Sequence, residues 1–418
     1  MSKYARNPWN TPRFIIALVI LPLLVHIAVT SVHSNVGMET RPFGGGNTCL
    51  PPIPKDSGTP NHPPFTIDGD GDLAAFPNIT GGDGSSWAQA RIIEDLVIDG
   101  NGSNAAACIA NTTDFIVIKN CTFSNTPAWS VWSAWEPQNT NWEHNYEKAD
   151  AFMKISPFEY VPSLNLINSS NVNVTNCTFR ETLGDGFCIE NSRDIVVNDS
   201  LSFECFVGIS TYQSLNISVT GSQFRENVLI CVAYGSTNQS LIADNNAVGA
   251  YYAYSLYTCK LDTVTNNTGT RANCIASIYD TNSTVITHNY FGQSISQAGI
   301  ALAVGYHGET WYCVNNTVKW NTLEGNEREG LRLRHARYNE ISYNNFIRNK
   351  EGCITQFSDE FSYNNIHDNE CIMWFDWTEF LLLTGLMGGT AAVLIAISLH
   401  LKKKHGRATK ITQKGKKM

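Results

Sequence analysis

A short strand-like phrase recurs through most of the chain, and this repetition restricts the possible folds more than any other feature. Residues 171–179 read NVNVTNCTF, and residues 118–123 read IKNCTF. Later copies contain ITHNYF, SYNNF and SYNNI. In each copy, apolar residues at alternate positions precede an asparagine, and another apolar residue follows it. A period of two in the apolar residues is typical of strands.

The phrases recur at a spacing of about 22 residues, apart from two longer gaps. A period of this size indicates a solenoid, in which each turn is one structural unit. A second recurring phrase, seen as FCIE, ICVA and GCITQ, lies about half a period earlier, so each turn has at least two strands. The residues that close successive copies are Phe123, Phe179, Phe203, Phe224, Val248, Gly269, Phe291, Leu323, Phe346 and Ile366. We therefore expect an all-β fold, a right-handed parallel β-helix of about 10–12 coils.

Asparagine suits the corners of such a coil for two physical reasons. Its backbone tolerates the left-handed conformation, and its amide can bond to neighbouring main-chain groups. Asparagines that stack in register can also bond to one another. Cys121 and Cys177 share one repeat position, so we expect them on neighbouring coils within reach of a disulfide. The alternative is that both pack as free, apolar thiols.

Charge is distributed unevenly along the chain. Residues 402–418 contain eight Lys or Arg and no acid, whereas all 37 acidic residues lie between two apolar runs and their flanks. This acidic middle argues against nucleic acid as a partner. The runs are FIIALVILPLLVHIAV at 14–29 and FLLLTGLMGGTAAVLIAISLHL at 380–401. The second is long enough to span a lipid bilayer, and the cationic flanks favour cytoplasmic ends.

These observations predict an ectodomain outside the cell, held by a membrane anchor, with a cytoplasmic C-terminal tail. Whether the N-terminal segment is cleaved stays open, and so does the oligomeric state. The expected parts are a signal peptide or signal anchor at 1–33, a Pro/Gly-rich linker at 34–64, a β-helix at 65–375 with a Trp-rich insertion at 124–163, a transmembrane helix at 380–401 and a basic tail at 402–418.

Cysteine and glycosylation patterns fit an exported domain. The 12 cysteines include no CxxC pair, which argues against a zinc site, and we expect no metal or cofactor. DGDGD at 68–72 lacks the later ligands of a calcium-binding loop, so we expect an ordinary turn there. The candidate N-glycosylation sites are Asn78, Asn101, Asn111, Asn120, Asn168, Asn173, Asn176, Asn198, Asn216, Asn238, Asn266, Asn282 and Asn315.

The lead-in FTIDGDGDLAAFPNITGG, followed by CIANTTDFIVIKNCTF and the asparagine-rich coils, resembles a known family. This family comprises the right-handed parallel β-helix proteins with NosD-like or carbohydrate-binding and sugar-hydrolase repeats, including archaeal-type membrane-anchored surface proteins. The resemblance covers about 65–375. It implies an extracytoplasmic protein that binds or processes carbohydrate. A NosD-like link to copper-enzyme maturation is also implied, but the sequence has no Met/His/Cys cluster suited to copper.

The Trp-rich insertion is the first candidate site. It contains Trp129, Trp132, Trp135, Trp142 and Tyr146. Aromatic rings are good recognition anchors, and their faces bind sugar rings, so this segment is a hypothetical carbohydrate site. The alternative is that the rings pack the insertion against the coils.

The basic segment GLRLRHARYNE is the second candidate site. Its Arg332, Arg334, His335 and Arg337 form a hypothetical patch for an anionic ligand, unless nearby glutamates balance their charge. Asp185 in LGDGFCIEN only loosely resembles a hydrolase Asp-Gly turn, and we expect a turn residue there. The sequence thus favours a surface protein that binds carbohydrate or other surface molecules. A polysaccharide lyase or glycoside hydrolase with unknown catalytic residues is the alternative.

Overall fold

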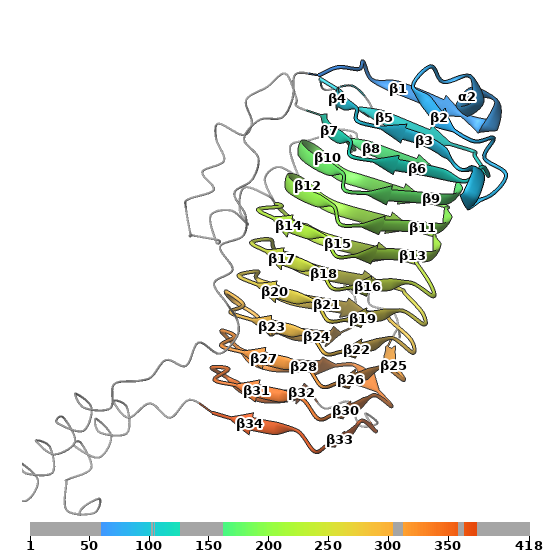
Figure 1. Ribbon diagram of the computed structural model, residues 1–418. Helices are drawn as coiled ribbons and strands as arrows, with labels where there is room; N and C mark the ends of the chain where they lie inside the picture. The colour runs from blue at the N-terminus through green and yellow to red at the C-terminus, as the bar shows by residue number, and fades with distance from the viewer. Residues whose placement is uncertain are drawn as a thin grey trace, which may run out of the picture. The chain divides into compact units, whose positions relative to one another are not determined.

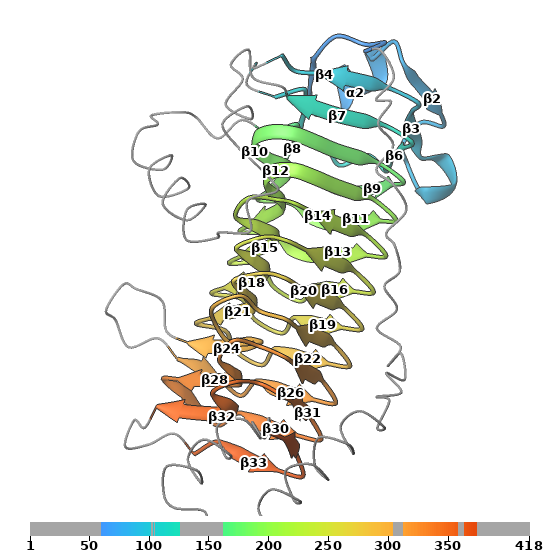
Figure 2. The same cartoon turned by 90° about the vertical axis from the view of Figure 1, so that its left-hand side faces the viewer.

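The described part of the chain winds into a parallel β-solenoid. In this computed structural model, about ten turns stack in one column, and three faces of strands surround a common core (Figure 1). Figure 2 shows the same column turned by a quarter. The predicted parallel coil architecture is confirmed. The structure describes residues 60–125 except 102 and 104, 162–303, 312–357 and 363–373.

Face 1 is a 12-stranded sheet to which each turn gives one strand in parallel. Only β2 runs antiparallel to its neighbour in this sheet. The strands are β2 (Ile79–Gly81), β3 (Arg91–Glu94), β6 (Ile116–Lys119), β9 (Ser170–Thr175), β11 (Arg193–Asn198), β13 (Leu215–Thr220), β16 (Leu241–Ala243), β19 (Thr263–Thr265), β22 (Val285–Thr287), β26 (Thr317–Lys319), β30 (Glu340–Ser342) and β33 (Asn365–His367).

Faces 2 and 3 belong to one 20-stranded sheet, because the long strands β10 (Thr178–Glu190) and β12 (Leu201–Tyr212) run through the corner between them. The other strands of face 2 are β4 (Val97–Asp99), β7 (Thr122–Asn125), β14 (Gln223–Arg225), β17 (Asn246–Val248), β20 (Thr268–Thr270), β23 (Tyr290–Gly292), β27 (Thr322–Glu324), β31 (Asn345–Ile347) and β34 (Glu370–Ile372). Those of face 3 are β1 (Phe65–Asp68), β5 (Ala107–Ala110), β8 (Leu164–Ile167), β15 (Ile230–Gly235), β18 (Tyr252–Tyr257), β21 (Cys274–Tyr279), β24 (Ile300–Ala303), β28 (Glu329–Arg334) and β32 (Gly352–Phe357).

Short elements complete the described structure. A two-stranded sheet pairs β25 (Cys313–Val314) with β29 (Ala336–Arg337), and a 3-10 helix, η1, spans Trp87–Gln89. The predicted turn at DGDGD is wrong, because these residues begin the helix α2 (Gly69–Ala75). The helix is fixed by the fully buried side chain of Leu73 and by Asp70, whose carboxylate accepts the main-chain N–H of Thr113 at 2.9 Å.

The predicted alignment of phenylalanines is correct for most turns but displaced in three. It placed Phe203, Val248 and Ile366 in register with the other phenylalanines. In the turns of Phe203 and Val248 a small, buried side chain takes the position in register, one residue earlier. Ile366 instead lies on β33 of face 1. The residues actually in register are Ser202, Ala247 and Cys371.

Asparagines form a ladder inside the corner between faces 1 and 2. From Asn267 onward, each amide oxygen accepts both the side-chain and the main-chain N–H of the asparagine one turn earlier. Asn289, for example, donates both to Asn321 Oδ1, at 2.9 Å and 3.0 Å. Because these amides are buried and paired, each turn fixes the backbone of its neighbour. The ladder consists of Asn245, Asn267, Asn289, Asn321, Asn344 and Asn369.

A different set of asparagines lies outside, at the corners. Asn111, Asn120 and Asn176 have φ values of 54°, 55° and 51°, and all three are exposed. Asparagine tolerates this left-handed conformation better than most residues. The predicted corner role is therefore confirmed, and it is distinct from the internal ladder.

Cys121 and Cys177 lie on neighbouring turns, as predicted, but both are free, buried thiols. The predicted disulfide between them is not formed in the structure. Each sulfur contacts a main-chain carbonyl instead, with Cys121 Sγ 3.3 Å from Lys119 O and Cys177 Sγ 3.4 Å from Thr175 O. The disulfide in the described residues joins Cys353 and Cys371 in the last two turns.

No helix among the described residues is long and apolar enough to cross a membrane. The apolar runs at 14–29 and 380–401 lie outside the described residues. The signal segment, the transmembrane helix and the basic tail therefore stay predictions, as do residues 34–59 of the linker.

Candidate functional site

Aromatic side chains form an exposed stack along the corner between faces 1 and 2. The last turns place His288, Trp320 and Tyr343 there, one residue per turn. The rings of His288 and Trp320 have centroids 5.2 Å apart, and those of Trp320 and Tyr343 have centroids 6.0 Å apart. Nearly parallel rings at such distances are offset and overlap only in part. Trp320 accordingly keeps 51% of its surface exposed.

A second stack lies along the corner between faces 3 and 1. The rings of Tyr338 and Tyr363 are almost parallel, with an interplanar angle of 5° and centroids 5.5 Å apart. Tyr338 is 58% exposed and Tyr363 is 64% exposed. The strands β26, β30 and β33 of face 1 lie between the two stacks. We call the five residues of both stacks, His288, Trp320, Tyr338, Tyr343 and Tyr363, the aromatic corners.

The aromatic corners occupy backbone positions that suit asparagine better. The φ values of Trp320, Tyr343 and Tyr338 are 54°, 57° and 56°. In earlier turns Asn120 and Asn176 hold the corner position that Trp320 holds. The left-handed conformation costs an ordinary residue about 1–2 kcal/mol. Stacking between the rings offsets part of this cost, and their exposure leaves ring faces open to a ligand.

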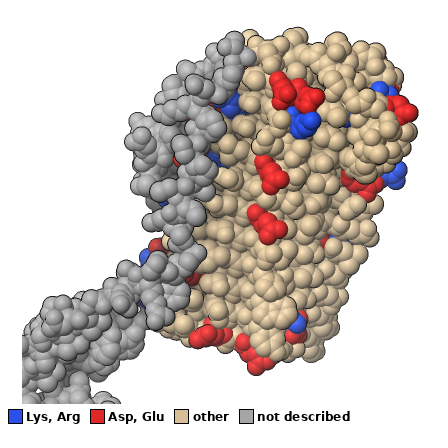
Figure 3. All heavy atoms as spheres, in the orientation of Figure 1, with Lys and Arg blue, Asp and Glu red and all other residues tan. Residues whose placement is uncertain are grey.

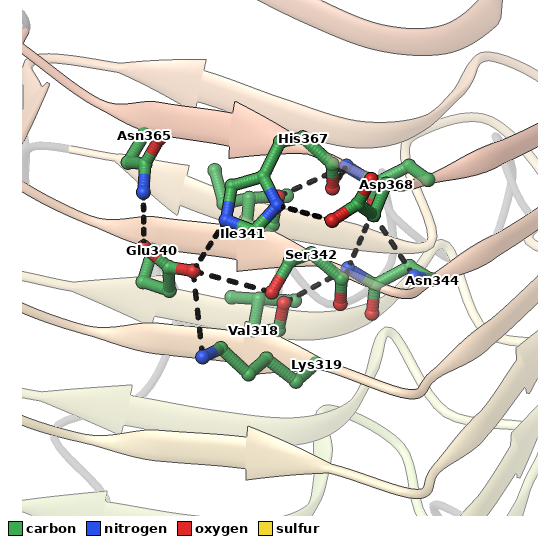
Figure 4. Close-up of polar contacts among 10 residues, drawn as sticks. Val318, Lys319, Glu340, Ile341, Ser342, Asn344, Asn365, His367 and Asp368 are labelled. Atoms are coloured by element: carbon green, nitrogen blue, oxygen red, sulfur yellow. Dashed lines mark hydrogen bonds and ion pairs between the residues drawn. The ribbon is translucent and has the colours of Figure 1, made fainter.

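A row of polar side chains lies on β26, β30 and β33 of face 1, and Figure 4 shows its contacts. Glu340 is its centre: Oε1 lies 3.4 Å from Lys319 Nζ and 2.8 Å from His367 Nε2. The amide of Asn365 donates to Glu340 Oε2 at 2.7 Å. On its other side, the His367 ring lies with Nδ1 2.8 Å from Asp368 Oδ2.

Local sequence explains why these side chains point outward. The segments TVK and EIS alternate, so the central Val318 and Ile341 take the inward positions. Ile366 of NIH is in register with Ile341 but is 38% exposed in the last described turn. Val318 and Ile341 are fully buried. The ladder asparagine that follows each strand holds it in register with the next turn. This regular support places Lys319, Glu340 and His367 on one surface.

The charges in the row stabilise one another. The hydrogen bond with His367 is the largest cause that lowers the pKa of Glu340. Contacts with Asp368 and then Glu340 raise the pKa of His367. Both shifts favour the charged forms of the two groups. As charged, hydrogen-bonded groups, Glu340 and His367 can bind a polar ligand.

The predicted carbohydrate site on the Trp-rich insertion lies outside the described residues. This applies to Trp129, Trp132, Trp135, Trp142 and Tyr146. Only the two ends of the insertion are described, and they meet where the amide of Asn125 donates to Pro162 O at 3.4 Å. The hypothesis that these rings bind sugar stays a prediction.

The four residues of the predicted basic patch lie in different surroundings. Arg332 forms an ion pair with the buried Glu329, and Arg334 ends β28 on face 3, exposed. His335 takes the corner, with a φ of 53°. Arg337 belongs to β29, and its guanidinium lies 3.6 Å from the centroid of the Tyr312 ring. The structure therefore divides the patch between two sheets, and an anionic ligand at these residues stays a prediction.

The candidate glycosylation sites fall into two groups by exposure. Asn78, Asn173, Asn198 and Asn238 are half-buried. The exposed ones, most of them at corners, are Asn101, Asn111, Asn120, Asn168, Asn176, Asn216, Asn266, Asn282 and Asn315. Modification of any of them stays a prediction.

Asp185 is not the turn residue that we expected. It lies inside β10, directly after a shift in register against β12, and only 8% of it is exposed. Its carboxylate accepts the hydroxyl of Ser210. Burial is the main cause that raises the pKa of Asp185 to about 6, which is the range of a general acid.

A family model described as periplasmic copper-binding protein (NosD) matches residues 141–312, which is less than half of the chain. The described residues of this span do not fit copper. No group of three or more His, Cys, Asp or Glu side chains in the described part of the chain is placed to hold a metal ion. The cysteines Cys205, Cys231 and Cys274 are buried.

Solved structures with a similar fold include a GH136 lacto-N-biosidase from Eubacterium ramulus, with 10% identity and a TM-score of 0.46. The match covers 67% of this chain but only 56% of that one. PfbA, a surface adhesin of Streptococcus pneumoniae, has 15% identity, coverage of 64% and 72%, and a TM-score of 0.41. An alginate lyase from a Paenibacillus species has 10% identity, coverage of 74% and 99%, and a TM-score of 0.43. No curated protein sequence matches the chain.

Proposed function

We propose that this protein is a cell-surface β-helix protein that binds carbohydrate through the aromatic corners and the polar row between them. One observation carries the proposal: Trp and Tyr recur, half-exposed, at corner positions where the backbone favours asparagine. Residues kept at an energetic cost, at the surface, are typical of a binding site.

The chemistry of the surface suits sugars. Offset stacking leaves part of each ring face uncovered, and such faces bind the C–H-rich side of a sugar ring. The polar row supplies hydrogen-bonding groups for sugar hydroxyls, and Asn365 and Glu340 are already held in place by their neighbours. Preorganised groups lose less entropy when they bind. The aromatic residues of the Trp-rich insertion remain a second proposed contact.

The proposal includes a location outside the cytoplasm and attachment to the lipid bilayer. Support comes from the apolar run at 380–401 with its basic flank and from the periplasmic family whose model matches. Membrane extraction at high pH, followed by protease protection of intact cells, tests both parts. A chain released at high pH, or one with a protected ectodomain, would contradict them.

A glycan array with the purified full chain in detergent tests the binding. The decisive variant is Trp320→Gly with Tyr343→Asn, because both substitutions suit the left-handed corner. We expect the fold to persist. Glycan affinity should fall by at least about tenfold, because two aromatic anchors are lost. Trp87→Ala is the matched control, since Trp87 is 48% exposed at the other end of the solenoid. Equal binding by both variants would contradict the proposed site.

A polysaccharide hydrolase or lyase is the second candidate function, and Asp185 is the observation that favours it. A buried carboxyl group with a pKa of about 6 can donate a proton near neutral pH. Asp185→Asn tests this function, because the amide keeps the shape but cannot donate a catalytic proton. Turnover that is lost in this variant, with binding retained, would support an enzyme. Glycan binding without turnover in the unmodified protein would reject it.

A further inference from the structure

We infer that the aromatic corners bind an uncharged glycan and that Glu340 is the residue that sets this preference. The inference rests on the proposed function, because it names the ligand class of the same site. It follows from the charges on face 1, where the four ionisable side chains of the row form a single chain of contacts.

The charges in this chain alternate in sign. The order is Lys319, Glu340, His367 and Asp368, and each neighbouring pair is in contact (Figure 4). The shifts in pKa keep Glu340 and His367 in the forms that attract each other. Each positive group on these strands therefore already has an acidic partner.

An acidic sugar would need a cation without a partner at this surface. Among the described residues of β26, β30 and β33, the basic side chains are Lys319 and His367, and both contact Glu340. A uronate that approached would meet the carboxylates of Glu340 and Asp368 as well. Like charges at such a surface disfavour binding and act as a device for specificity. Arg337, which precedes Glu340 by three residues, is held over the Tyr312 ring instead.

An uncharged sugar has no such penalty. Its hydroxyl groups can donate to the carboxylate oxygens and accept from the amide of Asn365, while its ring lies against the aromatic residues. On the face shown in Figure 3, acidic and basic side chains are likewise scattered among neutral ones. The polar row thus offers hydrogen bonds, and the aromatic corners offer ring faces, to an uncharged sugar.

Glu340 has the central place because it pairs with both cations. Glu340→Gln keeps the size and polarity of the side chain but removes the negative charge. Lys319 would then have no acidic partner in the row, whereas His367 would keep Asp368. The face would gain a net positive charge, which attracts uronates. This variant therefore separates charge selection from the aromatic contacts.

The experiment measures binding of neutral hexose oligosaccharides and uronate oligosaccharides of matched length to the full chain in detergent. We expect the unmodified protein to bind the neutral set and to discriminate against uronates. Glu340→Gln should bind uronates about threefold more tightly at low salt, the effect of one surface charge pair, and lose this gain in concentrated salt. Glu327→Gln is the matched control, because it frees Lys350 at another corner.

The possible outcomes separate the two proposals. If no oligosaccharide of either set binds, the proposed function fails. If the unmodified protein binds uronates more tightly than neutral sugars, carbohydrate binding stands but the inferred ligand class is overturned. If Glu340→Gln and Glu327→Gln have the same effect on uronate binding, the selecting role of Glu340 is overturned.

Discussion

The Oδ1 atom of Asp262 accepts the main-chain N–H of Ser240 at 2.8 Å. In later turns asparagine makes this contact, as where Asn339 Oδ1 accepts the N–H of Asn316 at 2.8 Å. Asp262 therefore stands between earlier turns, where a serine hydroxyl makes this contact, and later turns, where an amide makes it. Burial is the main cause that raises the pKa of Asp262 to about 7, although the bond from Ser240 opposes it. The folded state consequently retains a proton that an unfolded chain loses near pH 4.

The first prediction concerns the pH dependence that follows. Between about pH 4 and pH 7 only the folded state holds the proton on Asp262, so the free energy of unfolding falls as pH rises through this window. Asp262→Asn removes the titrating group and supplies the amide that later turns have at this position. We expect the variant to gain about 2–4 kcal/mol at pH 8 and almost nothing at pH 4. Urea unfolding at both pH values measures the difference, and an equal gain at the two would contradict the assignment.

The second prediction concerns the internal ladder. Asn321→Leu removes hydrogen bonds to Ile286 O and Asn344 Oδ1 and leaves the N–H of Asn289 without an acceptor. We expect a loss of about 3 kcal/mol, the cost of buried polar groups without partners. The control is Asn266→Ala at the exposed corner beside the ladder, where about 1 kcal/mol is expected. Thermal unfolding that ranks the two variants in the opposite order would disprove the role of the ladder.

The third prediction compares two tyrosines. Tyr338→Asn loses the stacking contact with Tyr363. It also lowers the cost of the left-handed backbone at this position, so we expect the free energy of unfolding to change by less than about 1 kcal/mol. Tyr257→Asn lies in a strand and has no such compensation, so it should destabilise more. Only the first should weaken glycan binding. A larger stability loss for Tyr338→Asn would remove the argument that this tyrosine serves a purpose other than folding.

The fourth prediction concerns the disulfide between Cys353 and Cys371, which joins the last two turns. Each turn of a solenoid contacts only its neighbours, so the effect of Cys371→Ser should stay local. We expect faster hydrogen exchange in β32 and β34 and unchanged exchange in the turns before β21, as mass spectrometry can show. Exchange that rises uniformly along the coil would mean that the disulfide stabilises the whole domain.

Much of the fold can be predicted from the sequence because each turn of a solenoid carries the same pattern of residues. The alternating apolar residues and the recurring asparagine predicted the strands, the corners and the turn length. The predicted register was wrong in turns whose inward side chain is smaller than those of the neighbouring turns. Ser202 and Ala247 take the inward position because small side chains fit there, and a pattern search that follows large apolar residues selects Phe203 and Val248 instead.

The candidate site was harder to predict because its signal is a replacement within the repeat. In HNYF, WNTL and YNNF the ladder asparagine is preserved, and the residue before it is His288, Trp320 or Tyr343. The recurring asparagine predicted left-handed corners, but only the structure shows that these three residues occupy them. Likewise, the contact between Glu340 and His367 joins neighbouring turns, 27 residues apart, and depends on side-chain positions that the repeat alone does not give.

The aromatic corners belong to the last turns, whereas α2 covers the first ones. Because every turn rests only on its neighbours, whole turns between these ends can be gained or lost without rebuilding either. Each such change would move the glycan-binding surface by about 4.8 Å relative to the helical cap. The number of turns thus determines the distance between the proposed binding surface and α2.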